Sequence, residues 1–270
     1  MLRSMKDMKN YSIGATDCII GQVKDFYFDD IAWVIRYVVV ETGTWLSSRE
    51  VLVSPIAIGQ PNSTDKILPA LITREQVKNS PDIDTKKPIS RQHEIRYLGY
   101  YSYPNYWSGN GMWDEALPSR KKMSEYVEGG VVADDLTDAG NPRERDEEAR
   151  HQNDDPHLRS CQAVKKYFVH ATDGDIGHVS GYLIDDETWA IRYLIVDTSN
   201  WWLGHQVLIA PQWLLDVSWL AGKVSVNLTR QAVKDAPPYD AEKHVDRNQE
   251  TKIYDHYGYT RYWAVRKVDE

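Results

Sequence analysis

The sequence predicts a mainly β protein built from two small antiparallel β-barrels in tandem, each followed by short helices and an aromatic tail. The first observation is an internal repeat, in which Leu2 to Trp107 aligns with Leu158 to Trp263 without a gap and about a third of the positions match. The second is that both copies contain several short β-branched segments at close spacing, as small barrels do. A repeat of roughly 100 residues can close its own core, so the pattern indicates a domain duplication.

The first hairpin of each copy is expected at Asp17-Cys18 and at the aligned Asp173-Gly174. Asp-Gly favours a tight turn, because glycine tolerates positive φ. Cys18 would adopt that conformation at a cost of roughly 1 kcal/mol. We therefore expect Cys18→Gly to stabilise the first copy.

The strand after this hairpin ends in paired acids, Asp29-Asp30 in the first copy and Asp185-Asp186 in the second. A divalent-cation site is one interpretation of the pair. Adjacent residues of a strand point to opposite faces, however, so a tight turn is favoured.

The most apolar segments, 34–40 and 190–196, are rich in β-branched and aromatic residues at both parities. This composition predicts strands that are covered on both faces. The strands that follow are expected to end at Pro55 and Pro211, because proline cannot donate a backbone hydrogen bond to a neighbouring strand.

Short helices are expected after each barrel. Thr73 and Gln76 have the spacing of a capping box, Thr229 takes the place of Thr73 in the second copy, and Asp246 with Gln249 repeats the pattern at a second helix. The aromatic tails that close the copies are Tyr101, Tyr103, Tyr106 and Trp107 in the first and Tyr257, Tyr259, Tyr262 and Trp263 in the second.

The organisation expected from the repeat is a first domain at 1–107, a linker at 108–157 and a second domain at 158–270. The linker is rich in Gly, Pro and charged residues, and partial disorder is expected of that composition. Cys18 and Cys161 occupy positions that do not correspond, which argues against a disulfide framework.

Charge and hydropathy exclude several classes of protein. The 270 residues carry a formal net charge of −8 and a pI near 5.5, which disfavours binding to nucleic acid. No apolar run approaches the roughly 18 residues that span a bilayer. The polar start of the chain also lacks the apolar core of a secretory signal. A cytoplasmic location is therefore expected.

Arg36 and Arg192 are the only charges within the two central strands, at equivalent positions. One interpretation is that each anchors an anionic group of a partner, since arginine offers a fork of donors. The favoured alternative is an ion pair with a carboxylate present in both copies, because an unpaired buried charge is costly. The carboxylates considered are Asp29 or Glu41 in the first copy and Asp185 or Asp197 in the second.

Four tryptophans stand at matching places in the two copies: Trp33 with Trp189, and Trp45 with Trp201. They are candidate hot spots of a binding interface. The favoured alternative is that they cap the ends of the barrels.

No catalytic residue, metal site or cofactor is predicted. His170, His178 and His205 have no histidine counterpart in the first copy, and His151 and His157 lie in the polar linker with only a weak metal-binding pattern. Phosphate-binding glycine loops, nucleophile elbows and paired-cysteine motifs are missing from the sequence.

Several segments together resemble the PRC-barrel family. In the second copy they are Ala171 to Val179, Asp185 to Tyr193 and Val207 to Pro211; in the first they are Gly21, Asp29-Asp30, Trp33, Arg36-Tyr37, Gly43 to Leu46 and Val51 to Pro55. The family is named after the cytoplasmic part of the photosynthetic reaction centre H subunit, and it also occurs in a ribosome maturation factor. The resemblance implies a small barrel that docks onto other proteins and shares no catalytic residues with its relatives.

The first copy departs from the family pattern at Cys18, Ile19 and Ile31, where glycine or polar residues are usual. The two isoleucines are expected to create an apolar contact surface.

The leading hypothesis is a non-enzymatic module for protein–protein interaction or assembly, with an unidentified protein or a second copy of the chain as partner. One alternative is an accessory to membrane photosynthetic electron transfer, resembling the H subunit, and binding to membranes or reaction-centre proteins would distinguish it. A second alternative is a role in ribosome or RNA maturation, which the acidic charge already weakens.

Overall fold

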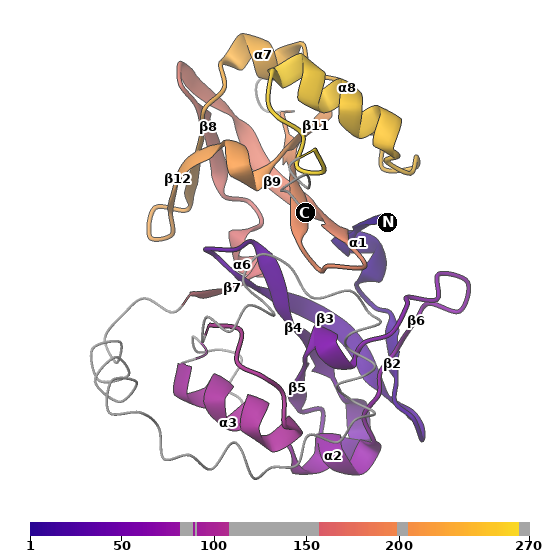
Figure 1. The fold of residues 1–270 in the computed structure, drawn as a ribbon. Coiled ribbons are helices and arrows are strands. Elements are labelled where there is room, and N and C mark those ends of the chain that lie inside the picture. Colours follow the sequence, from indigo (N-terminus) through magenta and orange to yellow (C-terminus); the bar gives the residue numbers. More distant parts are fainter. Residues whose placement is uncertain (82–88, 90, 108–156, 199–204, 265–270) are drawn as a thin grey trace, which may run out of the picture. The chain divides into compact units, whose positions relative to one another are not determined.

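The protein is mainly β, with two mixed sheets and six short α-helices among the residues described (Figure 1). The computed structural model describes residues 1–81, 89, 91–107, 157–198 and 205–264. The fold class expected from the sequence is thus confirmed in its coarse form. Within the described ranges, no helix combines the length and the apolar character needed to cross a membrane.

The chain divides into two compact units, and neither is contiguous in sequence. The first-repeat unit consists of Lys9–Cys161 and Glu187–Ala190, and the second-repeat unit of Met1–Met8, Gln162–Asp186 and Ile191–Glu270. Each unit therefore includes the N-terminal segment of the other repeat. Residues 108–156, almost all of the predicted linker, lie outside the described residues.

The sheet of the first-repeat unit has the strand order β5-β4-β3-β2-β6, and β7 pairs with β3 beside this path. Its strands are β2 (Ser12–Gly14), β3 (Ile19–Asp29), β4 (Val34–Glu41), β5 (Glu50–Val53), β6 (Ile67–Pro69) and β7 (Leu158–Ser160). Its helices are η1 (Gly43–Leu46), η2 (Pro55–Ala57), α2 (Arg74–Asn79) and α3 (Arg91–Tyr101).

The sheet of the second-repeat unit has the order β11-β10-β9-β8-β13-β12, and β1 pairs with β9 beside this path. Its strands are β1 (Leu2–Ser4), β8 (Phe168–Ala171), β9 (Gly174–Asp185), β10 (Ile191–Asp197), β11 (Gln206–Ile209), β12 (Leu214–Ser218) and β13 (Lys223–Val226). Its helices are α1 (Met5–Met8), η5 (Pro211–Trp213), α7 (Arg230–Lys234) and α8 (Arg247–Tyr257); α6 (Cys161–Val164) begins at the unit boundary.

The central strands are covered on both faces, as their composition predicts. Every residue of β4 except Glu41 is buried. In β10, Ile191 and the run Tyr193 to Val196 are buried. The strands that follow, β5 and β11, give way at Pro55 and Pro211 to single 3-10 turns, which confirms the expected strand ends.

The expectation of purely antiparallel barrels is wrong. β6, the last strand of the first repeat, runs parallel to β2, and β13, the last strand of the second repeat, runs parallel to β8. Pairing among the described residues leaves both sheets open rather than closing them into barrels. β6 is an edge strand that contains Pro69, which cannot donate to a further strand.

The N-terminal strands of the two repeats are exchanged. Leu2, Arg3 and Ser4 of β1 pair antiparallel with the C-terminal end of β9, whereas β7 pairs in the equivalent way with the end of β3. Leu158 of β7 is 4% exposed and joins a core cluster of the first-repeat unit with Tyr37 and Tyr97. A unit thus takes both backbone hydrogen bonds and core volume from the other repeat.

The hairpin turn between β9 and β10 also belongs partly to the first-repeat unit. The N–H group of Ile35 donates to the carbonyl oxygen of Trp189 at 2.9 Å, and Val34 forms an antiparallel bridge with Ala190. These contacts explain why Glu187–Ala190 groups with the first repeat.

The turn at Cys18 differs from the expected one. Gly174 has a φ of +140°, but Cys18 is not among the described non-glycine residues with positive φ. The carbonyl oxygen of Cys18 closes the hairpin by accepting a hydrogen bond from the N–H of Ala15 at 2.8 Å. The first copy therefore avoids the strain that was expected, and Cys18→Gly has no strain to relieve.

The predicted helix caps are confirmed. Thr73 and Gln76 form a capping box at α2, and Asp246 and Gln249 form one at α8. Thr229 caps α7 by accepting a hydrogen bond from the N–H of Ala232.

Truncation of Leu158 tests the strand exchange. Leu158→Ala is expected to lower the free energy of unfolding by about 2–4 kcal/mol, because it removes a buried side chain. The loss should appear as faster hydrogen exchange in β3 and β4 of the first repeat, with β10 unaffected. Leu215→Ala, at a position 61% exposed, is the control. Faster hydrogen exchange that is confined to the second-repeat unit would contradict the assignment of β7 to the first-repeat unit.

Candidate functional site

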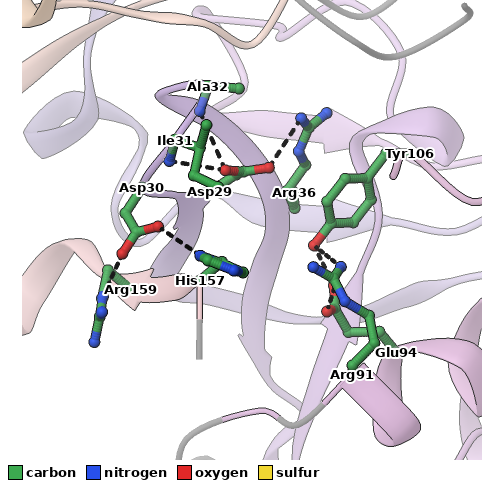
Figure 2. Close-up of polar contacts among 10 residues, drawn as sticks. All are labelled: Asp29, Asp30, Ile31, Ala32, Arg36, Arg91, Glu94, Tyr106, His157 and Arg159. Carbon is green, nitrogen blue, oxygen red and sulfur yellow. Dashed lines mark hydrogen bonds and ion pairs between the residues drawn. The ribbon is translucent and has the colours of Figure 1, made fainter. Parts of the chain in front are cut away.

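Arg36 lies on β4 and is 4% exposed. Its guanidinium is paired with the carboxylate of Asp29 at 3.2 Å, and it stacks over the ring of Tyr106 at 4.2 Å (Figure 2). Asp29 also accepts hydrogen bonds from the N–H groups of Ile31 and Ala32, which is the turn expected at the paired acids.

The second copy repeats this arrangement. Arg192 on β10 pairs with Asp185 at 3.4 Å and stacks over Tyr262 at 4.2 Å. The carboxylate partners are thus Asp29 and Asp185, two of the four that the sequence suggested. The guanidinium groups are engaged inside the fold.

A glutamate on the last helix of the first-repeat unit completes the cluster. Glu94, on α3, is 3% exposed and accepts hydrogen bonds from the hydroxyl groups of Tyr37 at 3.2 Å and Tyr106 at 2.5 Å. Arg91, one turn earlier, donates to Glu94 and to Tyr106, each at 3.1 Å, and its guanidinium stacks over Trp107 at 4.0 Å. Strand β4, through Tyr37, thus meets helix α3 and the aromatic tail at this carboxylate. Figure 2 shows Arg91 and Tyr106 beside Glu94.

The same cluster forms in the second-repeat unit from residues at equivalent positions. Glu250 is 2% exposed and accepts hydrogen bonds from Tyr193 and Tyr262, each at 2.9 Å. Arg247 pairs with Glu250 at 2.9 Å and stacks over Trp263 at 4.3 Å. We call these two sets the carboxylate clusters; their members are Arg36, Tyr37, Arg91, Glu94, Tyr106 and Trp107, and Arg192, Tyr193, Arg247, Glu250, Tyr262 and Trp263.

Burial dominates the electrostatics of the first carboxylate cluster. Burial raises the pKa of Glu94 from 4.5 to about 7, although Arg91 and the two tyrosine hydroxyls act in the opposite direction. Burial, together with the nearby Glu94, also raises the pKa of Tyr37 and of Tyr106 well above 10. Chemically, Glu94 is a carboxyl group able to take up and release a proton near neutral pH, held by donors that keep it in place.

The second residue of each acid pair fastens the exchanged strand. Asp30 binds Arg159 at 2.8 Å and lies 3.3 Å from the Nδ1 atom of His157, and its N–H donates to the carbonyl oxygen of His157 (Figure 2). Asp186 makes the reciprocal contacts with Arg3 at 2.6 Å and with the N-terminal ammonium group at 2.7 Å. Burial pushes the pKa of Asp186 up, but these two cations more than offset it and the pKa lies below its ordinary value.

The candidate tryptophans pack at turns. Trp33 and Trp189 both have positive φ, at 54° and 58°; Trp33 stacks on Phe28, and Trp189 is 2% exposed. Trp45 is half-buried and donates from its indole nitrogen to the carbonyl oxygen of Ile20 at 2.7 Å. Trp201 lies outside the described residues. The three described side chains thus pack or bond within the fold.

Metal-binding groups do not gather in the part of the chain that the structure describes, where no cluster of three His, Cys, Asp or Glu side chains is found. His170 pairs with Asp175 at 2.7 Å, and His157 faces Asp30. Both histidines are thus paired singly with a carboxylate.

Sequence reasoning missed the glutamates and the roles of Asp30 and Asp186. Arg91 and Glu94 align with Arg247 and Glu250 and are the two identities in the segments 91–100 and 247–256. The sequence therefore contained a signal: the arginine and the glutamate are the same in both copies of a helical segment whose other residues differ. Nothing local revealed that Asp30 and Asp186 bind the other repeat.

Comparison of the sequence with protein-family models gives no match, and comparison with curated proteins gives none either. The resemblance to PRC barrels therefore stays a prediction.

Replacement of Glu94 tests the first carboxylate cluster. Because the folded protein holds the Glu94 proton to a higher pH than the unfolded chain does, the free energy of unfolding should fall as pH rises from about 4.5 to about 7. The fall attributable to this group is at most about 3 kcal/mol. Urea denaturation across this range should give a flatter profile for Glu94→Gln, whereas the exposed Glu75→Gln keeps the wild-type slope. Equal slopes for all three proteins would contradict the assignment.

A double-mutant cycle tests the fastening of the exchanged strand. Asp30→Ala and Arg159→Ala should each destabilise the protein, and the double variant should lose less than the sum. The expected coupling is about 1–3 kcal/mol, because both side chains are largely buried and bonded to each other. Additive losses measured by urea denaturation would show that the two groups do not interact.

Proposed function

We propose that this chain is a non-enzymatic tandem protein, resembling the PRC-barrel family, that acts by binding another protein. The observation that carries the proposal is a contrast between interior and surface. Inside, the buried carboxylates and their tyrosine and arginine partners are the same in both repeats, and each set is bonded within its own unit. Outside, the large apolar side chains differ between the repeats.

The interior half of the contrast concerns the carboxylate clusters. Glu94 and Glu250 are 3% and 2% exposed, and each has two tyrosine hydroxyls and one arginine as partners. A catalytic acid must reach the atom to which it transfers a proton, and these carboxylates face side chains of their own unit. Their position supports a role in holding the last helix and the aromatic tail on the sheet.

The surface half concerns Ile19 and Leu71, which are 51% and 53% exposed. Both lie beside Gly14 at the end of β2. Ile19 is the cross-strand partner of Gly14, and Ala70, the residue before Leu71, donates a backbone hydrogen bond to the carbonyl oxygen of Gly14. The second repeat has Asp175 and Asn227 at these positions. Exposed apolar residues that have polar counterparts in the sister repeat support a contact specific to the first-repeat unit.

The sequence suggested a contact surface formed by Ile19 and Ile31 together. Both are exposed, Ile31 at 74%, but Ile19 begins the 11-residue strand β3 and Ile31 follows its end. The two side chains therefore lie roughly 30 Å apart along the strand and do not form one surface. Ile19 with Leu71 is the pair that we propose for binding.

The proposal is tested by giving the first-repeat unit the residues of its sister. The double variant Ile19→Asp, Leu71→Asn is expected to weaken capture of the native partner by about tenfold or more. The polar replacements remove the free energy that is gained when the two apolar side chains leave water in the contact. Affinity capture from the native cell with mass spectrometry identifies and quantifies that partner, and light scattering shows whether it is a second copy.

Ile31→Glu, which also installs the residue of the second repeat, is the matched control and should leave capture unchanged. Circular dichroism and thermal melting establish that all variants fold. Unchanged capture by the double variant would contradict the binding surface. Turnover of a small molecule that depends on Glu94 or Glu250 would contradict the non-enzymatic assignment.

A further inference from the structure

The end of the β12–β13 hairpin carries apolar side chains that the fold does not bury. Leu220, in the turn, is 106% exposed, and Phe168 on the neighbouring β8 is 61% exposed. Tyr167 and Trp219 are half-buried beside them. We call these four residues the hairpin tip. The turn forms the free end of the hairpin (Figure 1).

Hydrogen bonds hold the hairpin tip together. The hydroxyl group of Tyr167 donates to the carbonyl oxygen of Trp219 at 3.0 Å. The backbone N–H of Phe168 donates to the carbonyl oxygen of Gly222 at 2.9 Å. The rings of Tyr167 and Trp219 are 6.3 Å apart. These contacts support the turn that carries Leu220 and hold the backbone of Phe168 beside it.

The first repeat has nothing comparable at the aligned positions. Phe168, Trp219 and Leu220 align with Ser12, Ser63 and Thr64, and the counterpart of Tyr167, Tyr11, is buried. In the first repeat the counterpart of β12 forms only isolated bridges, Ile58 with Ala70 and Asn62 with Ile67. The full hairpin and its apolar residues thus occur together in the second repeat.

Positive charge surrounds the hairpin tip on a chain whose formal net charge is −8. The exposed Lys165 and Lys166 directly precede Tyr167, and Lys223 is paired with Phe168 across the sheet. The nearest acids along these strands are farther from the turn: Asp216 is two residues before the end of β12, and Asp175 is opposite His170. The local charge is opposite in sign to that of the whole chain.

We propose that the hairpin tip inserts into a lipid bilayer surface that carries anionic headgroups. An aliphatic residue at the apex, aromatic residues with polar groups just behind it and lysines around them match the depth profile of a membrane interface. The lysines attract anionic headgroups, and Leu220 with Phe168 enters the acyl boundary.

A lipid surface fits the hairpin tip better than a folded protein does. Four side chains on a projecting turn offer far less than the roughly 800 Å² that each partner contributes to a standard protein interface. A bilayer requires no shape complementarity, so a few inserted side chains suffice for reversible attachment. This inference is independent of the protein contact proposed above, which involves the first-repeat unit.

Vesicle co-sedimentation of the full chain tests the proposal. The wild-type protein should sediment with vesicles of phosphatidylcholine mixed with phosphatidylserine, and much less with phosphatidylcholine alone. Replacement by the residues of the first repeat, Phe168→Ser and Leu220→Thr, should lower the partition coefficient by about tenfold or more. Lys165→Gln with Lys166→Gln should remove the preference for anionic vesicles, and added salt should do the same to the wild type.

Ile31→Glu and Leu71→Asn, which alter exposed apolar residues of the first-repeat unit, are the controls and should leave sedimentation unchanged. Circular dichroism of each variant confirms the fold. Failure of the wild type to sediment with either vesicle overturns the proposal, as does equal sedimentation of the Phe168→Ser, Leu220→Thr variant. Loss of a protein partner by that variant, without vesicle binding by the wild type, would assign the hairpin tip to protein docking instead.

Discussion

The fold depends on how the edges of two long strands are paired, β3 in one sheet and β9 in the other. Each is flanked at its first half by a short strand of its own repeat, β2 or β8, and at its second half by an exchanged strand, β7 or β1. Without the exchanged strand, the backbone N–H and C=O groups of that half would form an open edge. The exchange satisfies these groups and brings Leu158 and Leu2 into the cores. Each repeat thereby depends on a segment of the other for the completion of its sheet.

Electrostatic contacts reinforce this arrangement at two places in each unit. Asp30 and Asp186 hold the exchanged strands through an arginine of the other repeat, and the carboxylate clusters hold the last helix and the aromatic tail on the central strand. A buried charge is tolerated only when its donors are fixed around it. The rings of Tyr106 and Tyr262 cover the guanidinium groups of Arg36 and Arg192, which pair with Asp29 and Asp185. The skew of the composition toward Tyr and Trp thus has a structural reason, since these rings supply both apolar surface and hydrogen bonds.

Much of the local structure could be predicted, because it rests on local chemistry. The caps at Thr73 and Asp246 and the strand ends at Pro55 and Pro211 follow from side chains that act on their own backbone. The parallel strand pairs and the open sheets could not be predicted, since they depend on the route of the chain between strands. The match of Glu94 with Glu250 marks the position in the sequence, but its burial becomes evident only when Tyr37 and Tyr106 are placed around it.

The sequence by itself determined that the protein consists of two related β units, that their central strands are buried on both faces, and that Arg36 and Arg192 require carboxylate partners. Only the tertiary structure decided which strand completes which unit. The segments Leu2-Arg3-Ser4 and Leu158-Arg159-Ser160 are identical, and both pair with a strand that ends at an aspartate and is followed by a second one. Either segment therefore offers the same backbone and side-chain contacts to either partner. The choice lies in the path of the chain through α1 and α6, which no local pattern encodes.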